Sequence, residues 1–257
     1  MNPEEYQKLE ALDREHWFYA GKRAIVRHWI DRFAALTPDS LLVDGGVGTG
    51  TWLAEMRHTC RVLGIDDHDE SLSISGPKLD GAVLKASLHQ VDLPDNHASV
   101  VTLLDVLEHV VDDAAALREM IRITRPGGLL IITVPALPWL WSDWDEILHH
   151  QRRYYRRDLL RLIRRPGVEV LRCAYTNSWA LPAMVVMRFL RRLIGGPPSG
   201  KPRAEERLPP AWLNRLFQAL YVKPACWFWF RPPLGASLLA ILRKRPDRDS
   251  PSGGDLT

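Results

Sequence analysis

The sequence predicts an α/β fold in which helices cover both faces of a parallel sheet. Between residues 40 and 175, short apolar segments typical of strands alternate with segments typical of helices. Such alternation favours a parallel sheet with crossover helices on both faces. The chain has 257 residues, of which 46% are hydrophobic and 25% are charged. It is therefore long enough for one large domain with an insertion, and its composition is that of a globular protein.

The individual elements follow from apolar spacing and from turn residues. The region 4–35 has apolar residues at helical spacing and is followed by Thr37-Pro38-Asp39, which favours a helical lead-in. Acidic residues open the predicted helix at 112–124, as suits the amino-terminal end of a helix. The predicted strands are 40–44, 61–66, 83–88, 100–105, 129–134, 168–174 and 237–243, and the other predicted helices are 49–58, 157–165, 179–194 and 211–230.

These elements divide the chain into five parts. We expect a helical lead-in at 1–39, a sheet domain at 40–175, a helical insertion at 176–234, the last strand of the sheet at 235–245 and a disordered polar tail at 246–257. Within the insertion, a segment rich in glycine, proline and charge joins the two helices.

The charges are divided unevenly along the chain. Residues 1–150 carry 13 Lys and Arg against 24 Asp and Glu, whereas residues 151–257 carry 21 against 7, so net charges of −11 and +14 add up to +3. The basic part also holds four of the ten tryptophans. A basic and aromatic region favours an anionic partner such as a membrane surface, a phosphorylated lipid or a nucleic acid.

The cysteines and the amino-terminal residues indicate the compartment. Cys60, Cys173 and Cys226 are odd in number and widely spaced, which favours neither a disulfide framework nor a zinc site. The first thirty residues lack the apolar stretch of a signal peptide. The best candidate for a membrane span, 173–187, has fifteen uncharged residues, and about 20 are needed to cross a bilayer. We expect a cytoplasmic protein, with peripheral attachment to the inner face of the cytoplasmic membrane as an alternative.

A glycine-rich turn follows the first predicted strand. The segment Asp44-Gly45-Gly46-Val47-Gly48-Thr49-Gly50 joins an apolar strand to a helix. In such a turn the backbone N–H groups face a ligand, and glycine lets that ligand come close. A dinucleotide-binding turn has the form G-x-G-x-x-G, but here Thr51 or Leu53 occupies the third glycine position. The turn therefore argues against a nicotinamide-dependent oxidoreductase.

The Asp-x-Gly-x-Gly-x-Gly form of this turn resembles the first motif of the class I S-adenosylmethionine-dependent methyltransferases. Further segments agree with that family in order and spacing: Asp66 at the end of the second strand, Leu-Pro-Asp-Asn at 93–96, Leu-Asp-Val-Leu-Glu-His-Val at 104–110 and Arg-Pro-Gly-Gly at 125–128. The resemblance covers about residues 40–175 and the last strand. It implies a Rossmann-like, mostly parallel seven-stranded sheet, with S-adenosyl-L-methionine as methyl donor and S-adenosyl-L-homocysteine as product.

The resemblance also implies a cofactor site at the ends of the first, second and fourth strands. Asp66 corresponds to the family's acid that binds both ribose hydroxyls, a pairing that two carboxylate oxygens suit. The residue that meets the adenine amino group stays open, with Ser87 and Leu88 preferred. For Trp17 in the lead-in, a lid over the cofactor and a packing role are both open. The candidate cofactor-binding residues are Asp44, Gly45, Gly46, Gly48, Gly50, Asp66, Asp67, Ser87, Leu88, Asp105, Val106 and Trp17.

The acceptor side should lie beyond the carboxyl ends of the strands. The connector 139–154 gathers indoles, imidazoles and guanidiniums and resembles the Asp-Glu…His-x-Arg-Arg-Tyr stretch of one methyltransferase subgroup. Transfer to a hydroxyl needs a base near the acceptor, and the catalytic candidates are His150, His149 and Arg153. Alternatively, His150 and Arg153 tie the connector to the sheet, with Asp145 as a partner. The candidate acceptor-binding residues are Trp141, Arg152, Tyr154, Glu108 and His109.

Methyl transfer from a sulfonium is an in-line displacement, so we expect no metal. Arg152 and Arg153 are suited to clamp a phosphate or carboxylate of the acceptor. Glu108 and His109 follow the fourth strand, where the resemblance implies the methionine end of the cofactor. For His109, packing within the turn is an equally good interpretation.

The insertion has two amphipathic helical candidates and four consecutive aromatic residues at 227–230. One interpretation is a pair of helices that lies in the membrane interface, with arginines on anionic lipid. The alternatives are a cap that packs on the sheet domain and the interface of a homodimer.

Together these features predict methyl transfer from S-adenosylmethionine to an oxygen or carbon of a hydrophobic or lipid-linked small molecule. The basic region would suit an acceptor that also carries an anionic group. A nucleic-acid partner is a weaker prediction, because the arginines are interleaved with aliphatic runs. Two other classes stay open: an RNA methyltransferase, and a catalytically silent cofactor-binding scaffold subunit at a membrane.

Overall fold

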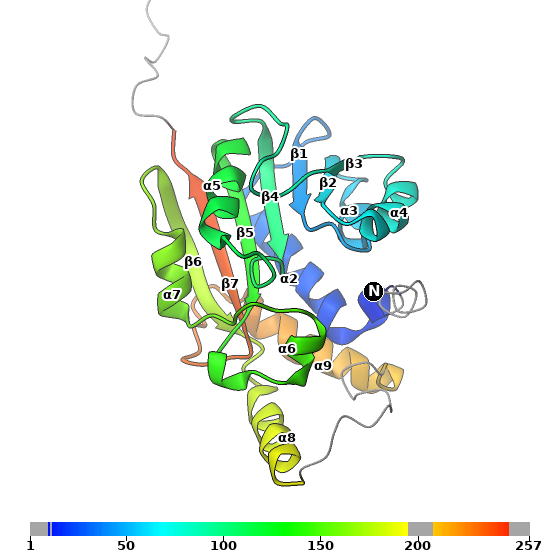
Figure 1. The fold of residues 1–257 in the computed structure, drawn as a ribbon, viewed down its shortest axis with the longest axis vertical. Helices are drawn as coiled ribbons and strands as arrows, with labels where there is room; N and C mark the ends of the chain where they lie inside the picture. Colours follow the sequence, from blue (N-terminus) through cyan, green and yellow to red (C-terminus); the bar gives the residue numbers. More distant parts are fainter. Residues whose placement is uncertain (1–9, 11, 195–207, 247–257) are drawn as a thin grey trace, which may run out of the picture.

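A seven-stranded sheet forms the centre of the computed structural model, which describes residue 10, residues 12–194 and residues 208–246. The strand order is β3-β2-β1-β4-β5-β7-β6 (Figure 1). The strands are β1 (Leu41–Gly45), β2 (Arg61–Asp66), β3 (Val83–Lys85), β4 (Ala98–Leu104), β5 (Thr124–Pro135), β6 (Val168–Thr176) and β7 (Ser237–Lys244). The first five are parallel, and β7 is antiparallel to its neighbours β5 and β6. The predicted Rossmann-like, mostly parallel seven-stranded fold is confirmed.

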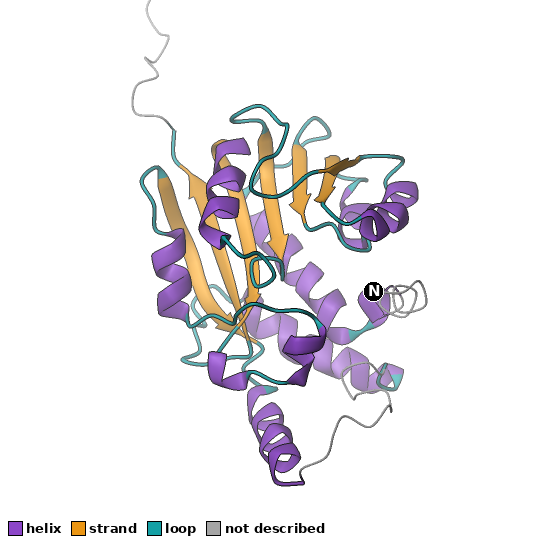
Figure 2. Ribbon diagram, viewed as in Figure 1, coloured by secondary structure: helices purple, strands orange, loops and turns teal. Residues whose placement is uncertain are grey.

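Helices cover both faces of this sheet (Figure 2). One core cluster joins the sheet to α5 and α7, and the other joins it to α2, α3 and α9. Neighbouring residues of a strand serve opposite clusters, as Leu42 and Val43 of β1 do. The helices are α2 (Trp17–Phe33), α3 (Thr51–Met56), α4 (Asp69–Lys78), α5 (Asp113–Ile123), α6 (Asp143–Ile147), α7 (Arg156–Ile163), α8 (Leu181–Ile194) and α9 (Ala211–Cys226).

Helix α2 of the lead-in packs against α9 of the insertion. The Trp29 indole N–H donates to the Ala225 carbonyl over 3.2 Å. A Cβ atom at Gly21 would lie 2.8 Å from the Tyr221 ring, so the glycine permits this close approach. By contrast, α8 extends away from the sheet (Figure 1). The insertion is therefore divided between a helix that covers the sheet and one that projects from it.

The strands were more predictable than the helices. Helix α4 was not predicted, because its buried residues are Ser71 and Ser75 and it carries Pro77 near its end. Helix α9 ends at Cys226, two residues after Pro224, so the aromatic segment 227–230 lies outside it. Strand β3 ends at Lys85 rather than at residue 88. The predicted tail at 246–257 and the linker of the insertion lie almost entirely outside the described residues.

Candidate active site

The glycine turn after β1 has the backbone that its sequence demands. Gly46 and Gly48 have φ angles of +74° and +52°, in the left-handed region that favours glycine. A Cβ atom at Gly46 would lie 2.6 Å from Cγ2 of Val106, so this glycine lets the turn after β4 pack on the loop. At Gly48 the nearest atom would be a carbonyl oxygen 3.9 Å away. Gly48 therefore faces open space, where a ligand can approach.

Asp66 is fixed against this loop. Its Oδ2 atom accepts hydrogen bonds from the Gly48 N–H at 3.3 Å and the Ser71 hydroxyl at 2.7 Å, and Oδ1 accepts from the His68 N–H at 3.1 Å. Asp67 is more exposed and pairs with the His68 imidazole at 2.6 Å. The structure thus brings together Asp66 and Gly48, two of the candidate cofactor-binding residues.

Asp44 is a buried residue near the carboxyl end of β1. It accepts a hydrogen bond from the Thr102 hydroxyl at 2.5 Å. Burial raises the pKa of Asp44 to about 8, and the nearby charges of Asp66 and Asp13 act in the same direction, while the Thr102 hydrogen bond opposes them. A cationic ligand at this edge would favour the ionised form again.

The residues next to the glycine turn form its other walls. A Cβ atom at Gly50 would lie 2.9 Å from Ser75 Cβ, and one at Gly45 would lie 2.9 Å from Cδ2 of Leu88. Leu88 therefore lies against the end of β1, beside the loop. Ser87 lies in the exposed turn and pairs with the His89 ring at 3.0 Å.

The turn after β4 is held by a buried lysine of α2. Lys22 donates to Oδ2 of Asp105, and the Thr133 hydroxyl donates to Oδ1 at 2.7 Å. Burial would raise the pKa of Asp105, but Lys22 and the Thr133 hydrogen bond outweigh it and hold that pKa below its usual value. Lys22 belongs to no sequence motif and was not predicted as a site residue. It lies on the same side of the helix as the buried Ile25 and Trp29, and this spacing could have indicated a buried lysine.

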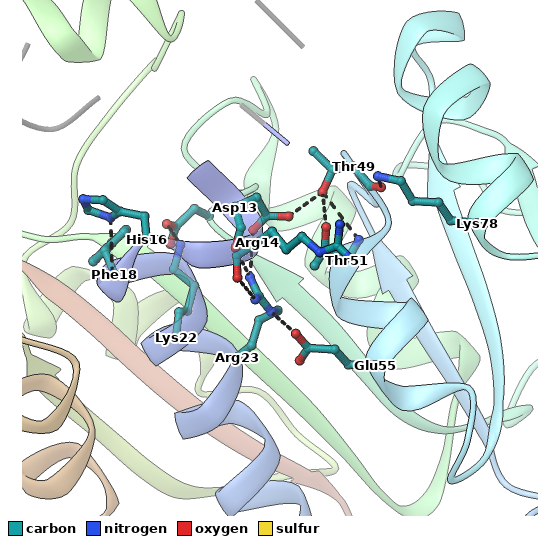
Figure 3. A network of polar contacts seen from close by, with 11 residues as sticks. Asp13, Arg14, His16, Phe18, Lys22, Arg23, Thr49, Thr51, Glu55 and Lys78 are labelled. Carbon is teal, nitrogen blue, oxygen red and sulfur yellow. Dashed lines mark hydrogen bonds and ion pairs between the residues drawn. The ribbon is translucent and has the colours of Figure 1, made fainter. Parts of the chain in front are cut away.

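The lead-in is bonded to the glycine loop (Figure 3). Asp13 accepts from the Thr49 hydroxyl and, at 3.0 Å, from the Arg23 guanidinium. Arg23 also reaches Glu55 of α3 at 2.8 Å, and Lys78 donates to the Thr49 carbonyl at 2.8 Å. These links were not predicted, because their residues lie far apart in the sequence and belong to no motif. They place the segment before α2 beside the loop.

Trp17 contacts the insertion. Its ring lies 5.4 Å from that of Trp179, 5.8 Å from Phe217 and 6.0 Å from Tyr221, between centroids. Its backbone N–H donates to the Asn214 side chain at 2.8 Å. Trp17 therefore makes packing contacts with the insertion.

Asp145 organises the connector after β5. This buried carboxylate accepts from His150 Nδ1 at 2.9 Å, from Arg153 Nε at 2.6 Å and from the Ser142 N–H at 2.9 Å. Burial would raise the pKa of Asp145, but the hydrogen bonds from His150 and Arg153 outweigh it and hold that pKa well below its usual range. His149 is exposed and has a φ angle of 57°. The expected ties of His150 and Arg153 to Asp145 are present.

Arg152 and Tyr154 attach the connector to the start of α5. Arg152 pairs with Asp113 at 3.0 Å and donates to the Val111 carbonyl at 2.8 Å. The buried Tyr154 hydroxyl donates to Asp113 at 2.7 Å, and burial together with this bond raises the pKa of Tyr154. Trp141 is half-buried nearby in the connector. Arg152 and Tyr154 thus make structural contacts within the chain.

Glu108 and His109 meet His150 at the carboxyl edge of the sheet. Glu108 is fully buried, and neither of its carboxylate oxygens has a hydrogen-bond partner among the described residues. Burial and the charge of Asp105 raise the pKa of Glu108 well above its usual value. The rings of His109 and His150 lie edge to face, 4.8 Å apart. Residues from two distant segments therefore form one polar cluster.

The chain is similar to known methyltransferases. Residues 43–132 match the model of a family described as a methyltransferase domain. A ubiquinone/menaquinone biosynthesis C-methyltransferase from Shewanella frigidimarina is 32% identical over 117 residues, 41% of this chain and 46% of that protein. A ubiquinone biosynthesis O-methyltransferase from Aeromonas salmonicida is 31% identical over 145 residues, 50% of this chain and 60% of that protein. The chain spans about half the length of the curated relatives it matches.

Solved structures agree in fold. A putative methyltransferase from Bacillus halodurans has a TM-score of 0.58 at 17% identity, covering 86% of this chain and 99% of that one. This likeness places the chain in the class of Rossmann-like α/β proteins. Within that class, residues 43–132 match the methyltransferase-domain family, and the cofactor that this similarity implies is S-adenosyl-L-methionine.

A large side chain at Gly48 should block the cofactor. We expect Gly48→Trp to weaken binding of S-adenosylhomocysteine, measured by calorimetry, by at least about 100-fold, or roughly 2.7 kcal/mol, because position 48 faces open space at the loop. Gly127→Trp is the matched control, since Gly127 also has a positive φ angle. A Cβ atom there would meet nothing within 4 Å, but Gly127 lies near the start of β5, away from the loop. Unchanged binding by Gly48→Trp would show that the loop does not hold the cofactor.

Proposed function

We propose that this protein transfers a methyl group from S-adenosylmethionine to an oxygen or carbon of a hydrophobic or lipid-linked small molecule. The observation that carries the proposal is the contact between Gly46 and Val106. It joins the glycine loop to the turn that continues into Glu108 and His109. The cofactor edge and the polar cluster with His150 are therefore neighbours, as transfer between a cofactor and an acceptor requires.

On the cofactor side, the cofactor supplies a methyl group on a sulfonium centre. Asp66 offers carboxylate oxygens beside the Gly48 N–H, an arrangement that suits a ribose diol. Asp105 follows β4 with its carboxylate held by Lys22, and Asp44 is available to ionise beside a positive charge. These acids together suit a cationic nucleoside.

On the acceptor side, His150 is the group suited to take a proton from a hydroxyl. Asp145 occupies its Nδ1 atom at 2.9 Å, which fixes the ring and leaves Nε2 as the acceptor nitrogen. Arg153 shares the same carboxylate, so it acts as a positioning residue for His150. The structural tie and the proton-accepting role are therefore compatible in one side chain.

A hydrophobic or lipid-linked acceptor is supported by an exposed aromatic surface on the insertion. Trp212, Trp227 and Trp229 expose 69%, 63% and 80% of their surface. Arg172 of β6 holds the segment 227–230 from within the core, donating to the Phe228 and Phe230 carbonyls at 2.7 and 2.8 Å. Among the described helices, none has the length and apolarity to cross a bilayer. We propose peripheral attachment to a membrane surface through these tryptophans.

The relatives fit a lipophilic acceptor, since two of them are named for ubiquinone biosynthesis. An RNA acceptor is favoured less, because the described part of the insertion exposes several tryptophans and leucines. The third alternative, a catalytically silent cofactor-binding scaffold, would transfer a methyl group to neither a lipophilic molecule nor RNA.

The acceptor class is tested by labelled cofactor. The purified protein is incubated with S-adenosylmethionine carrying a labelled methyl group and with separated lipid, small-molecule and RNA fractions of the cell. We expect the label in the lipid fraction or among apolar small molecules, because the described part of the insertion exposes large apolar side chains. Label in RNA alone, or in no fraction despite normal binding of S-adenosylhomocysteine, would refute the proposed function.

The role of His150 is tested by His150→Ala. Loss of a general base lowers turnover by about 10²–10⁴-fold, so we expect kcat to fall by that amount while affinity for S-adenosylhomocysteine is kept. His58→Ala, which removes an exposed histidine after α3, serves as the control with unchanged kcat. If His150→Ala loses cofactor binding to the same extent as turnover, the residue has a purely structural role.

Membrane attachment is tested with vesicles of phosphatidylglycerol and phosphatidylcholine. We expect the double variant Trp227→Ser/Trp229→Ser to bind them at least about tenfold more weakly, a loss of roughly 1.4 kcal/mol, since interfacial tryptophans anchor proteins to bilayers. Trp139→Ser is the control, because Trp139 is exposed but lies in the connector. A homodimer formed through the same surface would instead bind no vesicles, and the double variant would become monomeric in sedimentation.

A further inference from the structure

The polar cluster at the carboxyl edge of the sheet has the composition of a metal site. One ligand atom from each of Glu108, His109 and His150 lies within 4.8 Å of the other two. We propose that these three side chains bind a divalent transition-metal ion. The sequence did not reveal the site, because two ligands follow β4 and the third lies in the connector after β5.

The Glu108 carboxylate is the first argument for a cation. It is fully buried, and both oxygens are without a hydrogen-bond partner among the described residues. A buried carboxylate is ordinarily paired or coordinates a metal. Lys22 and Arg153, whose charges act on Glu108, pair with other acids, Asp105 and Asp145. A divalent ion bound at the cluster would give the Glu108 carboxylate a charged partner of its own.

The histidines are already arranged as ligands. Asp145 accepts from Nδ1 of His150 at 2.9 Å, so Nε2 carries the free lone pair. A carboxylate behind a ligating histidine is the usual support of a metal site. His109 is exposed, and its ring lies edge to face with that of His150, 4.8 Å apart. Both imidazoles therefore bring a ligand nitrogen to the cluster.

The donor set defines the class of ion. Two imidazoles and one carboxylate suit Zn²⁺, Mn²⁺, Fe²⁺ or Co²⁺, and three protein ligands leave positions open for water or for an oxygen of a substrate. If the proposed function holds, an acceptor hydroxyl bound there would lose its proton more readily, and activation of the acceptor would pass from His150 to the ion. Binding of the ion itself does not depend on that function.

The test uses the full chain stripped of metal with a chelator and titrated with Co²⁺, followed by visible absorption and calorimetry. We expect one Co²⁺ per chain, with the absorption of a four- or five-coordinate ion. Glu108→Gln and His150→Asn should each lower Co²⁺ affinity by at least about 100-fold, and Asp145→Asn by about 10–100-fold. Binding of S-adenosylhomocysteine by each variant checks that it is folded.

The chain offers a matched control. Asp66, Asp67 and His68 form a second, more exposed group with ligand atoms within 4.8 Å of one another. His68→Asn should leave Co²⁺ binding unchanged. Absence of stoichiometric Co²⁺ binding, its survival in both Glu108→Gln and His150→Asn, or its loss in His68→Asn would each overturn the proposal. A protein that binds Co²⁺ as described but methylates nothing would refute the proposed function while leaving the metal site standing.

Discussion

The partly buried ion pair between Lys22 and Asp105 is the contact on which the candidate site depends. It joins α2 of the lead-in to the turn after β4, across elements that are far apart in the sequence. Asp105 has a positive φ angle, so the chain changes direction there and carries Val106 to the glycine loop. Without a cation on Asp105, an uncompensated carboxylate would lie beside the buried Glu108, an arrangement that low-dielectric surroundings disfavour strongly.

Most charged side chains at this edge of the sheet are bound in ion pairs. Lys22 neutralises Asp105, and Arg153 with His150 holds Asp145. Glu108 lies between these pairs without a partner of its own among the described residues. The charges of the site therefore do more than bind ligands, because they also determine which oxygen and nitrogen atoms stay available after folding.

Local patterns predicted most of the fold and the cofactor edge. The glycine turn and Asp66 could be predicted because one short motif contains both their residue types and their spacing. Lys22 and Asp13 could not, since their partners come from tertiary packing. Glu108 lies near His150 because the turn after β4 and the connector after β5 meet at the same edge of the sheet. The two residues are about forty positions apart, and such a spacing does not predict a contact. Trp17 shows the same limit, because its neighbours Trp179, Phe217 and Tyr221 lie more than 160 residues away in the sequence.

Helix α2 makes contacts of two kinds along its length. Lys22 and Arg23 reach the cofactor edge, while Gly21 and Trp29 pack against α9. The helix thus joins the turn after β4 and helix α3 to the insertion that bears the exposed tryptophans. A displacement of α9 that moved α2 would also move these contacts. If a ligand of the insertion alters the contact between α2 and α9 and thereby changes the affinity of the loop for its own ligand, the coupling is reciprocal. Binding at the loop must then change the affinity of the insertion by the same factor.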